Sequence, residues 1–246
     1  MNIKKATVTV DAPTAVPEAR TPVPTMPTRP SWLGVATVVA LVAFAYMAFV
    51  YAPEDSVQGP TQRIFYIHVP SAWIAFVGFA IVFAGSIGYL VTRGDRWDTI
   101  AAASAEIGFL FTTVVLVTGM MWAKEIWGVY WTWDPRLTSF LLLWLLYVAY
   151  LVVRAYVPDP AKKARFSAVI GIVAFLDVPI VFLSVKLWRT IHPTPVVITE
   201  NGPAMPTSML LALMTGLLAF SLFFAYLLRL RLSVRAMQNA LEEDEL

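Results

Sequence analysis

Apolar residues gather along the chain into six long runs that are separated by short polar segments. Each run holds roughly 20 residues, which as a helix is enough to cross a hydrocarbon core about 30 Å thick. Charged and turn-forming residues, such as those at 92–96, mark the breaks between runs. The pattern therefore predicts an all-α polytopic membrane protein with six transmembrane helices: Trp32–Tyr51, Val69–Val91, Thr99–Trp122, Thr138–Tyr156, Arg165–Leu187 and Ser208–Leu230.

The composition agrees with a membrane protein and narrows its function. Hydrophobic residues make up 59% of the 246 residues and charged residues 14%, whereas soluble domains carry about 25% charged residues. The chain has no cysteine, which excludes a thiol redox step, a cysteine-ligated metal centre and covalent haem attachment to its own thiols. A net charge of +2 does not favour nucleic-acid binding. No hydrolytic or redox catalytic motif is recognisable, so we expect a binding or transfer protein rather than an enzyme.

The two ends of the chain differ from its apolar middle. Residues 1–31 contain six of the 17 prolines, so this segment is expected to be a disordered cytoplasmic tail. Residues 32–230 are assigned to the transmembrane domain. Residues 231–246 are basic and then acidic, and they are expected to form a charged cytoplasmic extension of the last helix.

Lysine and arginine are distributed unevenly over the segments that connect the helices. With the N-terminus inside, 13 of the 18 basic residues lie on the cytoplasmic side and five lie outside. This bias predicts that both termini are cytoplasmic. Three segments then face outward: Ala52–His68, Ala123–Leu137 and Trp188–Thr207.

The chain contains two histidines, His68 and His192, and both are predicted at the outer membrane boundary. A single histidine at such a boundary is more often a structural residue. Two histidines that distant segments bring to one face are better candidates for metal ligands. Neutral imidazole is a common axial ligand of haem iron, so the pair could hold a haem between them.

Four of the nine tryptophans lie within residues 122–133, in the part of the chain between the two histidines. An aromatic belt at the membrane interface could explain some of them. Trp127, Trp131 and Trp133, however, share a predicted loop, 123–137, with glycine and proline. Such a loop could form a platform for a large planar apolar ligand. Asp134, which precedes a proline, is expected to brace this loop and cap the helix that begins near Leu137–Thr138.

Four further charged residues are candidates for special roles. Arg63 and Arg136 lie near the first histidine and the tryptophan loop, and they could bind carboxylates of a ligand or lipid phosphates. Glu106 and Asp177 lie within predicted transmembrane helices. Buried carboxyls there could mark a proton or substrate path, or they could be protonated and hydrogen-bonded across helices.

Three segments together resemble a known family. Residues 127–139, WGVYWTWDPRLTS, resemble the tryptophan-rich WWD signature of haem-handling membrane proteins of cytochrome c biogenesis. Residues 64–73 and 184–192, which carry the histidines, resemble the segments that flank this signature in one branch, the haem exporter protein C or cytochrome c maturation protein C (CcmC) family. The resemblance covers approximately residues 61–192.

The resemblance implies a function and a site. Members of the family handle haem on the outer, periplasmic side of the bacterial inner membrane and present it to the haem chaperone CcmE. The haem is haem b, held transiently and without a covalent bond. Carried over by position, His68 and His192 would be the axial ligands of the iron, and Arg63 and Arg136 would contact the propionates. The remaining residues of the implied haem-binding site are Trp127, Trp131, Trp133 and Asp134.

The resemblance also implies partners. These are CcmE, the ABC transporter subunits CcmA and CcmB, the small single-helix subunit CcmD and membrane lipids, with no nucleic acid. Tyr130, Pro135, Phe140 and Pro193 depart from the family pattern. Pro193 restricts the preceding His192 toward an extended conformation.

Three other functions remain open from the residues alone. A membrane b-type cytochrome for electron transfer would place its histidines within helices, facing each other in the bundle. A subunit that transports haem or another small molecule would line a path with polar residues. A scaffold without a ligand would use its aromatic residues to anchor lipids.

Overall fold

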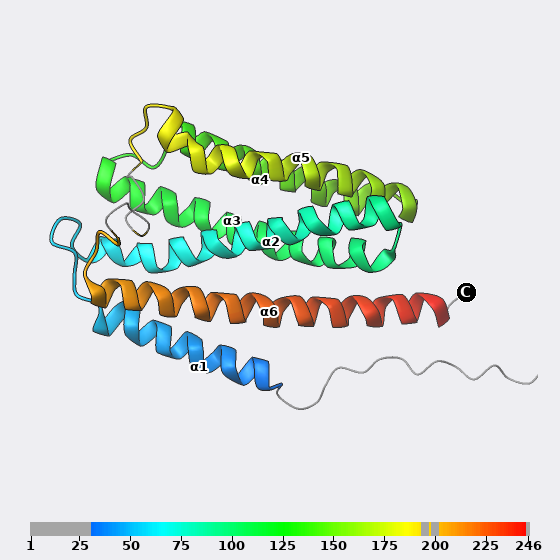
Figure 1. The fold of residues 1–246 in the computed structure, drawn as a ribbon, viewed down its shortest axis with the longest axis horizontal. Coiled ribbons are helices and arrows are strands. Elements are labelled where there is room, and N and C mark those ends of the chain that lie inside the picture. The colour runs from blue at the N-terminus through cyan, green and yellow to red at the C-terminus, as the bar shows by residue number, and fades with distance from the viewer. Residues whose placement is uncertain (1–30, 193–196, 198–201, 245–246) are drawn as a thin grey trace, which may run out of the picture.

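The computed structural model describes residues 31–192, 197 and 202–244. Within them the chain is helical and carries no strand, apart from an isolated bridge between Asp55 and Gly59. The elements in chain order (Figure 1) are α1 (Trp32–Tyr46), a π-helical turn η1 (Met47–Tyr51), a 3-10 helix η2 (Pro60–Ile64), α2 (Phe65–Thr92), α3 (Asp95–Trp127), α4 (Pro135–Tyr156), α5 (Pro160–Leu187) and α6 (Thr207–Asp244).

Six helical segments of the described chain are long and apolar enough to cross a membrane. They confirm the six predicted helices, but the helices extend beyond the apolar runs. For example, α3 runs past Trp122 to Trp127, and α6 continues to Asp244. Hydropathy marks only the part of a helix that suits hydrocarbon, whereas capping residues set where a helix begins and ends. Gly128, with φ of 76°, ends α3 in a left-handed conformation that glycine adopts without strain.

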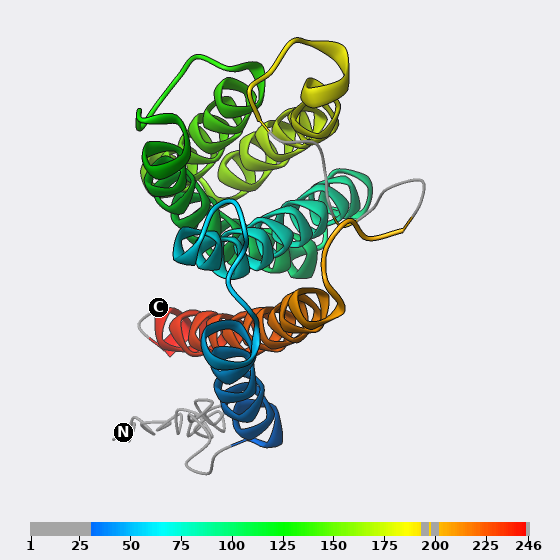
Figure 2. The same ribbon diagram turned by 90° about the vertical axis from the view of Figure 1, so that its left-hand side faces the viewer.

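The helices form three tiers (Figures 1 and 2). The pair α4 and α5 lies on one side, α2 and α3 lie in the middle, and α6 and α1 lie on the other side. The central helix α2 packs against α3, α5 and α6, and α1 packs against α6. Phe79 of α2 stacks on Tyr147 of α4 in the main core, with ring centroids 3.6 Å apart. A Cβ added to Gly78 would lie 3.2 Å from the Gly108 Cα, so glycines allow α2 and α3 to approach closely.

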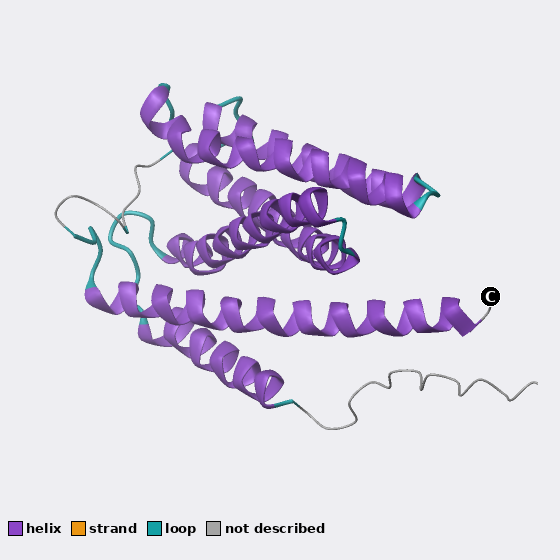
Figure 3. Ribbon diagram, turned by 45° about the vertical axis from the view of Figure 1, so that its right-hand side comes forward, coloured by secondary structure: helices purple, strands orange, loops and turns teal. Residues whose placement is uncertain are grey.

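The long connections between helices gather at one end of the bundle (Figure 3), which we call the loop end. In the described chain it comprises residues 52–64, 128–134, 188–192 and 202–206. The opposite end, which we call the turn end, carries the short connections at 93–94 and 157–159, the start of α1 and the end of α6. The described parts of all three segments predicted to face outward therefore lie at one end.

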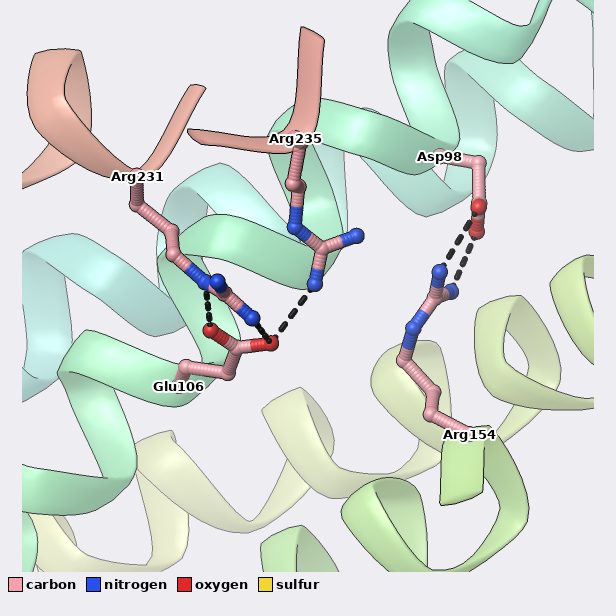
Figure 4. Close-up of polar contacts among 5 residues, drawn as sticks. All are labelled: Asp98, Glu106, Arg154, Arg231 and Arg235. Atoms are coloured by element: carbon pink, nitrogen blue, oxygen red, sulfur yellow. Dashed lines mark hydrogen bonds and ion pairs between the residues drawn. The ribbon is translucent and has the colours of Figure 1, made fainter. Parts of the chain in front are cut away.

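Ion pairs join the helices toward the turn end (Figure 4). The Glu106 carboxylate of α3 accepts hydrogen bonds from Arg231 and Arg235 of α6. Asp98 of α3 and Arg154 of α4 form a bidentate pair with N–O distances of 2.6 and 2.9 Å. Glu106 therefore pairs with two arginines, and this contact anchors α6 to α3 beyond the apolar run of α6.

Candidate functional site

His68 lies in the first turn of α2 and packs against α3. Its Nδ1 atom is 2.9 Å from the Thr118 hydroxyl oxygen. The Trp122 ring meets the imidazole edge-on, with centroids 5.9 Å apart. A Cβ added to Gly119 would lie 3.1 Å from the imidazole Cε1. Three residues on one turn of α3 therefore surround the imidazole. Thr118 contacts it through its hydroxyl and Trp122 through its indole, and Gly119 leaves room for it because it has no side chain.

Residues 52–64, the first connection of the loop end, help to hold Trp122 beside His68. The Asp55 carboxylate accepts hydrogen bonds from the backbone N–H groups of Val57 and Gln58, each at 2.8 Å. The Gln58 side chain in turn accepts a hydrogen bond of 2.9 Å from the Trp122 indole N–H. Arg63 donates from Nη1 to the Ala48 carbonyl at 2.9 Å, which ties η2 to η1. One N–H group of Arg63 thus holds η2 against η1, and its other N–H groups can donate to a second partner.

The tryptophan-rich loop is shorter than predicted. The expected loop covered 123–137, but α3 continues to Trp127 and α4 begins at Pro135, so the loop itself comprises 128–134. Trp131 and Trp133 meet edge-to-face with centroids 5.8 Å apart. The Trp133 side chain is 75% exposed. The Lys124 ammonium lies 5.4 Å from the Tyr130 ring centroid and donates to the Gly128 carbonyl. The loop therefore presents aromatic rings at the surface.

Asp134 connects this loop to the segment that carries the second histidine. One carboxylate oxygen accepts a hydrogen bond of 2.9 Å from the Arg136 backbone N–H, which caps α4. The other oxygen accepts a hydrogen bond of 2.9 Å from the Ile191 backbone N–H. The side chain is 8% exposed. The predicted capping role is confirmed, although α4 starts at Pro135, earlier than expected.

His192 lies beyond the end of α5, next to the residue that Asp134 holds. Its backbone N–H donates to the Thr190 hydroxyl at 3.0 Å, and its side chain is half-buried. Both His192 and Arg136 lie close enough to His68 to interact with it electrostatically. The structure therefore brings these three residues into one region. Pro193, which departs from the family pattern, lies outside the described residues.

Arg136 is half-buried in the first turn of α4. Within the described chain its guanidinium makes no hydrogen bond and no ion pair. A partly buried cation of this kind favours an anionic partner.

Sequence reasoning overlooked Thr118, Gly119 and Gln58. Thr118 and Gly119 are two polar or small residues within an apolar run, which is the signal that could have marked them. Asp177 is buried in α5, and its Oδ2 has no hydrogen-bond partner among the described residues. Asp177 lies within α5 and not in the connections of the loop end.

The loop end offers two imidazoles, surface indole rings and a guanidinium that makes no hydrogen bond or ion pair with the described residues. This set suits a flat apolar ligand that carries a metal and acidic groups. The fold and these side chains define a multi-pass helical membrane protein with a candidate ligand site at one end of its bundle.

The chain belongs to the haem exporter protein C family, whose family model "Heme exporter protein C" matches residues 16–246. It is 39% identical over 196 residues to Heme exporter protein C of Bradyrhizobium diazoefficiens, covering 80% of this chain and 74% of the relative. It is 34% identical over 210 residues to Heme exporter protein C of Escherichia coli K12, covering 85% and 82%. A putative cytochrome c biosynthesis ccmC-like mitochondrial protein of Marchantia polymorpha is 34% identical over 179 residues, covering 73% and 74%.

Proposed function

We propose that this protein binds haem at the loop end and delivers it for cytochrome c maturation. Membership of the haem exporter protein C family supports haem handling. The observation that supports the proposal is that His192 and Arg136, from two distant segments, both lie within electrostatic range of His68. Two segments that are distant in sequence supply the imidazoles, and Asp134 links one of them to the loop.

Each residue has a role that follows from its chemistry. His68 and His192 are proposed as the axial ligands of the iron, because neutral imidazole nitrogen binds haem iron well. Trp127, Trp131 and Trp133 are proposed to support the flat apolar face of the ring. Arg136 is proposed to bind a propionate, and Arg63 is a second candidate for that contact. Asp134 acts through the backbone and holds the tryptophan loop against the His192 segment.

The chain positions the haem, and the haem supplies its own reactivity. The imidazoles of His68 and His192 would hold the iron and would limit its reaction with oxygen. The ligand is haem b, held without a covalent bond, so that it can pass to the chaperone CcmE. This role is that of a transfer protein rather than an enzyme.

The location and partners extend the same proposal. The excess of basic residues in segments toward the turn end supports a cytoplasmic turn end. The loop end then faces the periplasm from the bacterial inner membrane. An ABC-type exporter complex is implied by the family description, with CcmA, CcmB and the small CcmD as the proposed subunits.

Absorption spectroscopy of the detergent-purified protein tests the proposal. We expect a six-coordinate low-spin haem spectrum in the parent, and weakened or lost haem in His68→Ala and in His192→Ala. Trp97→Ala, a substitution near the turn end, is the control and should leave the spectrum unchanged. Equal haem content in the parent and both histidine variants would contradict the proposal. Haem that cannot be transferred to purified CcmE would instead favour a permanent electron-transfer cytochrome.

A further inference from the structure

The Thr118 hydroxyl lies between a carbonyl group and the His68 imidazole. Its oxygen is 2.8 Å from the Val114 carbonyl oxygen and 2.9 Å from the His68 Nδ1. A carbonyl oxygen can only accept a hydrogen bond, and a hydroxyl has one hydrogen to donate. Both contacts are hydrogen bonds only if the Thr118 hydrogen goes to Val114 and the hydroxyl accepts its second hydrogen bond from His68. This assignment places a hydrogen on Nδ1.

Two other sites in the bundle show the same pattern with an unambiguous donor. The Thr113 hydroxyl donates to the Phe109 carbonyl at 2.9 Å and accepts from the Trp144 indole N–H at 2.9 Å. The Ser221 hydroxyl donates to its own helix at 2.7 Å and accepts from the Trp73 indole N–H at 3.1 Å. An indole nitrogen is always a donor. Thr118 repeats this arrangement with an imidazole in place of the indole.

We infer that Thr118 is a positioning residue that holds His68 in the Nδ1–H tautomer and so leaves the Nε2 lone pair free to bind a metal. The hydrogen bond at one imidazole nitrogen determines which nitrogen is available to a metal. In water, neutral histidine prefers the opposite tautomer, with the hydrogen on Nε2. Without Thr118, the nitrogen proposed to face the haem would therefore mostly carry a hydrogen.

The residues packed around His68 oppose a flip of the imidazole ring, which would exchange the positions of its nitrogen and carbon atoms. Gly119 leaves room for Cε1, and the Trp122 ring packs against the imidazole at an interplanar angle of 73°. The Trp122 ring is itself fixed by its hydrogen bond to Gln58. The tautomer and the orientation of the ring are therefore set together, by residues on one turn of α3.

The neutral character of Thr118 also suits a protein that must release its ligand. A carboxylate partner would increase the basicity of the imidazole strongly and tighten its bond to a metal. A hydroxyl orients the ring without adding a charge. This part of the inference rests on the proposed function, whereas the position of the hydrogen does not.

Nuclear magnetic resonance of the haem-free protein tests the position of the hydrogen. The chain has only two histidines, so ¹⁵N-histidine labelling yields two imidazoles, and His192→Ala assigns the His68 signals. At a pH of about 8.5, neutral histidine predominates. We expect protonated Nδ1 and unprotonated Nε2 at His68 in the parent and in Thr118→Ser. In Thr118→Val the major form should change to Nε2–H. A parent protein with Nε2–H, or a Thr118→Val variant with an unchanged tautomer, would overturn the inference.

Thr113→Val is the matched control, because it removes the same kind of hydroxyl bridge from the same helix. We expect it to leave the His68 tautomer unchanged, whereas a change there as large as in Thr118→Val would overturn the inference. Comparable elution and helicity of the two valine variants will show that both are folded.

Haem titration then tests the positioning role. Loss of a hydrogen-bond partner behind a metal ligand typically costs about 10- to 100-fold in affinity. We expect such a loss in Thr118→Val, with recovery in Thr118→Ser. A changed tautomer with unchanged haem affinity would refute the positioning role. If the parent itself binds no haem, the proposed function fails, while the magnetic resonance result still decides the tautomer.

Discussion

The charged side chains have different partners at the two ends of the bundle. Toward the turn end, Glu106 and Asp98 pair with arginines from other helices. At the loop end, the described residues form no ion pair, and the Arg136 guanidinium has no partner among them. The Asp134 carboxylate is satisfied by backbone N–H groups instead. The turn end therefore uses its charges to hold helices together, whereas the Arg136 cation of the loop end forms no ion pair with the described residues.

Arg154→Ala should produce the largest loss of stability. It leaves the Asp98 carboxylate, which is 20% exposed, without its bidentate partner. We expect the free energy of unfolding to fall by about 3 kcal/mol, as for other buried pairs that lose one member. Unfolding in detergent measures this change. Haem affinity of the folded fraction should not change. Loss of haem binding at unchanged stability would contradict the proposed difference between the two ends.

Asp134→Asn should reduce stability less than Arg154→Ala does, and it should reduce haem binding more. The amide retains one acceptor oxygen, so one of the two backbone hydrogen bonds is lost, at a cost of about 1–2 kcal/mol. Haem affinity should fall because the His192 segment is no longer held against the loop. Both quantities can be measured on the same preparation.

Asp159→Asn is the matched control for this prediction. Asp159 caps α5 at the turn end through a hydrogen bond of 2.7 Å from the Lys162 backbone N–H. It should lose comparable stability and no haem affinity. If both variants lose haem equally, the role of Asp134 is that of an ordinary helix cap.

Arg136→Ala should affect binding without affecting the fold. Since the guanidinium has no partner among the described residues, its removal should leave the unfolding midpoint nearly unchanged. Loss of one charge-assisted contact to a propionate should weaken haem binding about tenfold, which corresponds to about 1.4 kcal/mol. Arg136→Lys should recover part of the affinity. A large drop in stability would show that Arg136 serves the fold instead.

Trp133→Ala should have the smallest effect of these four. The side chain is 75% exposed, so its loss should cost no stability. Loss of one aromatic contact is worth about 1 kcal/mol, or roughly fivefold in haem affinity. The control is Trp97→Ala on α3, near the turn end, where haem affinity should stay constant. Equal effects of the two tryptophans would contradict a role for the loop.

The sequence was sufficient to predict six helices and one shared end for both histidines, because hydropathy and basic residues report on the membrane. It was insufficient for contacts between distant segments. The cap at Asp134 is local and was predicted, but its second bond to Ile191 depends on the tertiary structure. The pairing of Glu106 with Arg231 was missed for the same reason, since the basic residues of α6 resemble a solvated extension.

The central claim is that His68 and His192 bind one iron. Electron paramagnetic resonance of the ferric haem-loaded protein, labelled with ¹⁵N only at histidine, tests it most directly through the hyperfine coupling of ligand nitrogens. The account predicts two directly bound ¹⁵N nuclei in the parent, one from each imidazole, and a single directly bound one in His68→Ala or in His192→Ala. One coupled nucleus or none in the parent would contradict it.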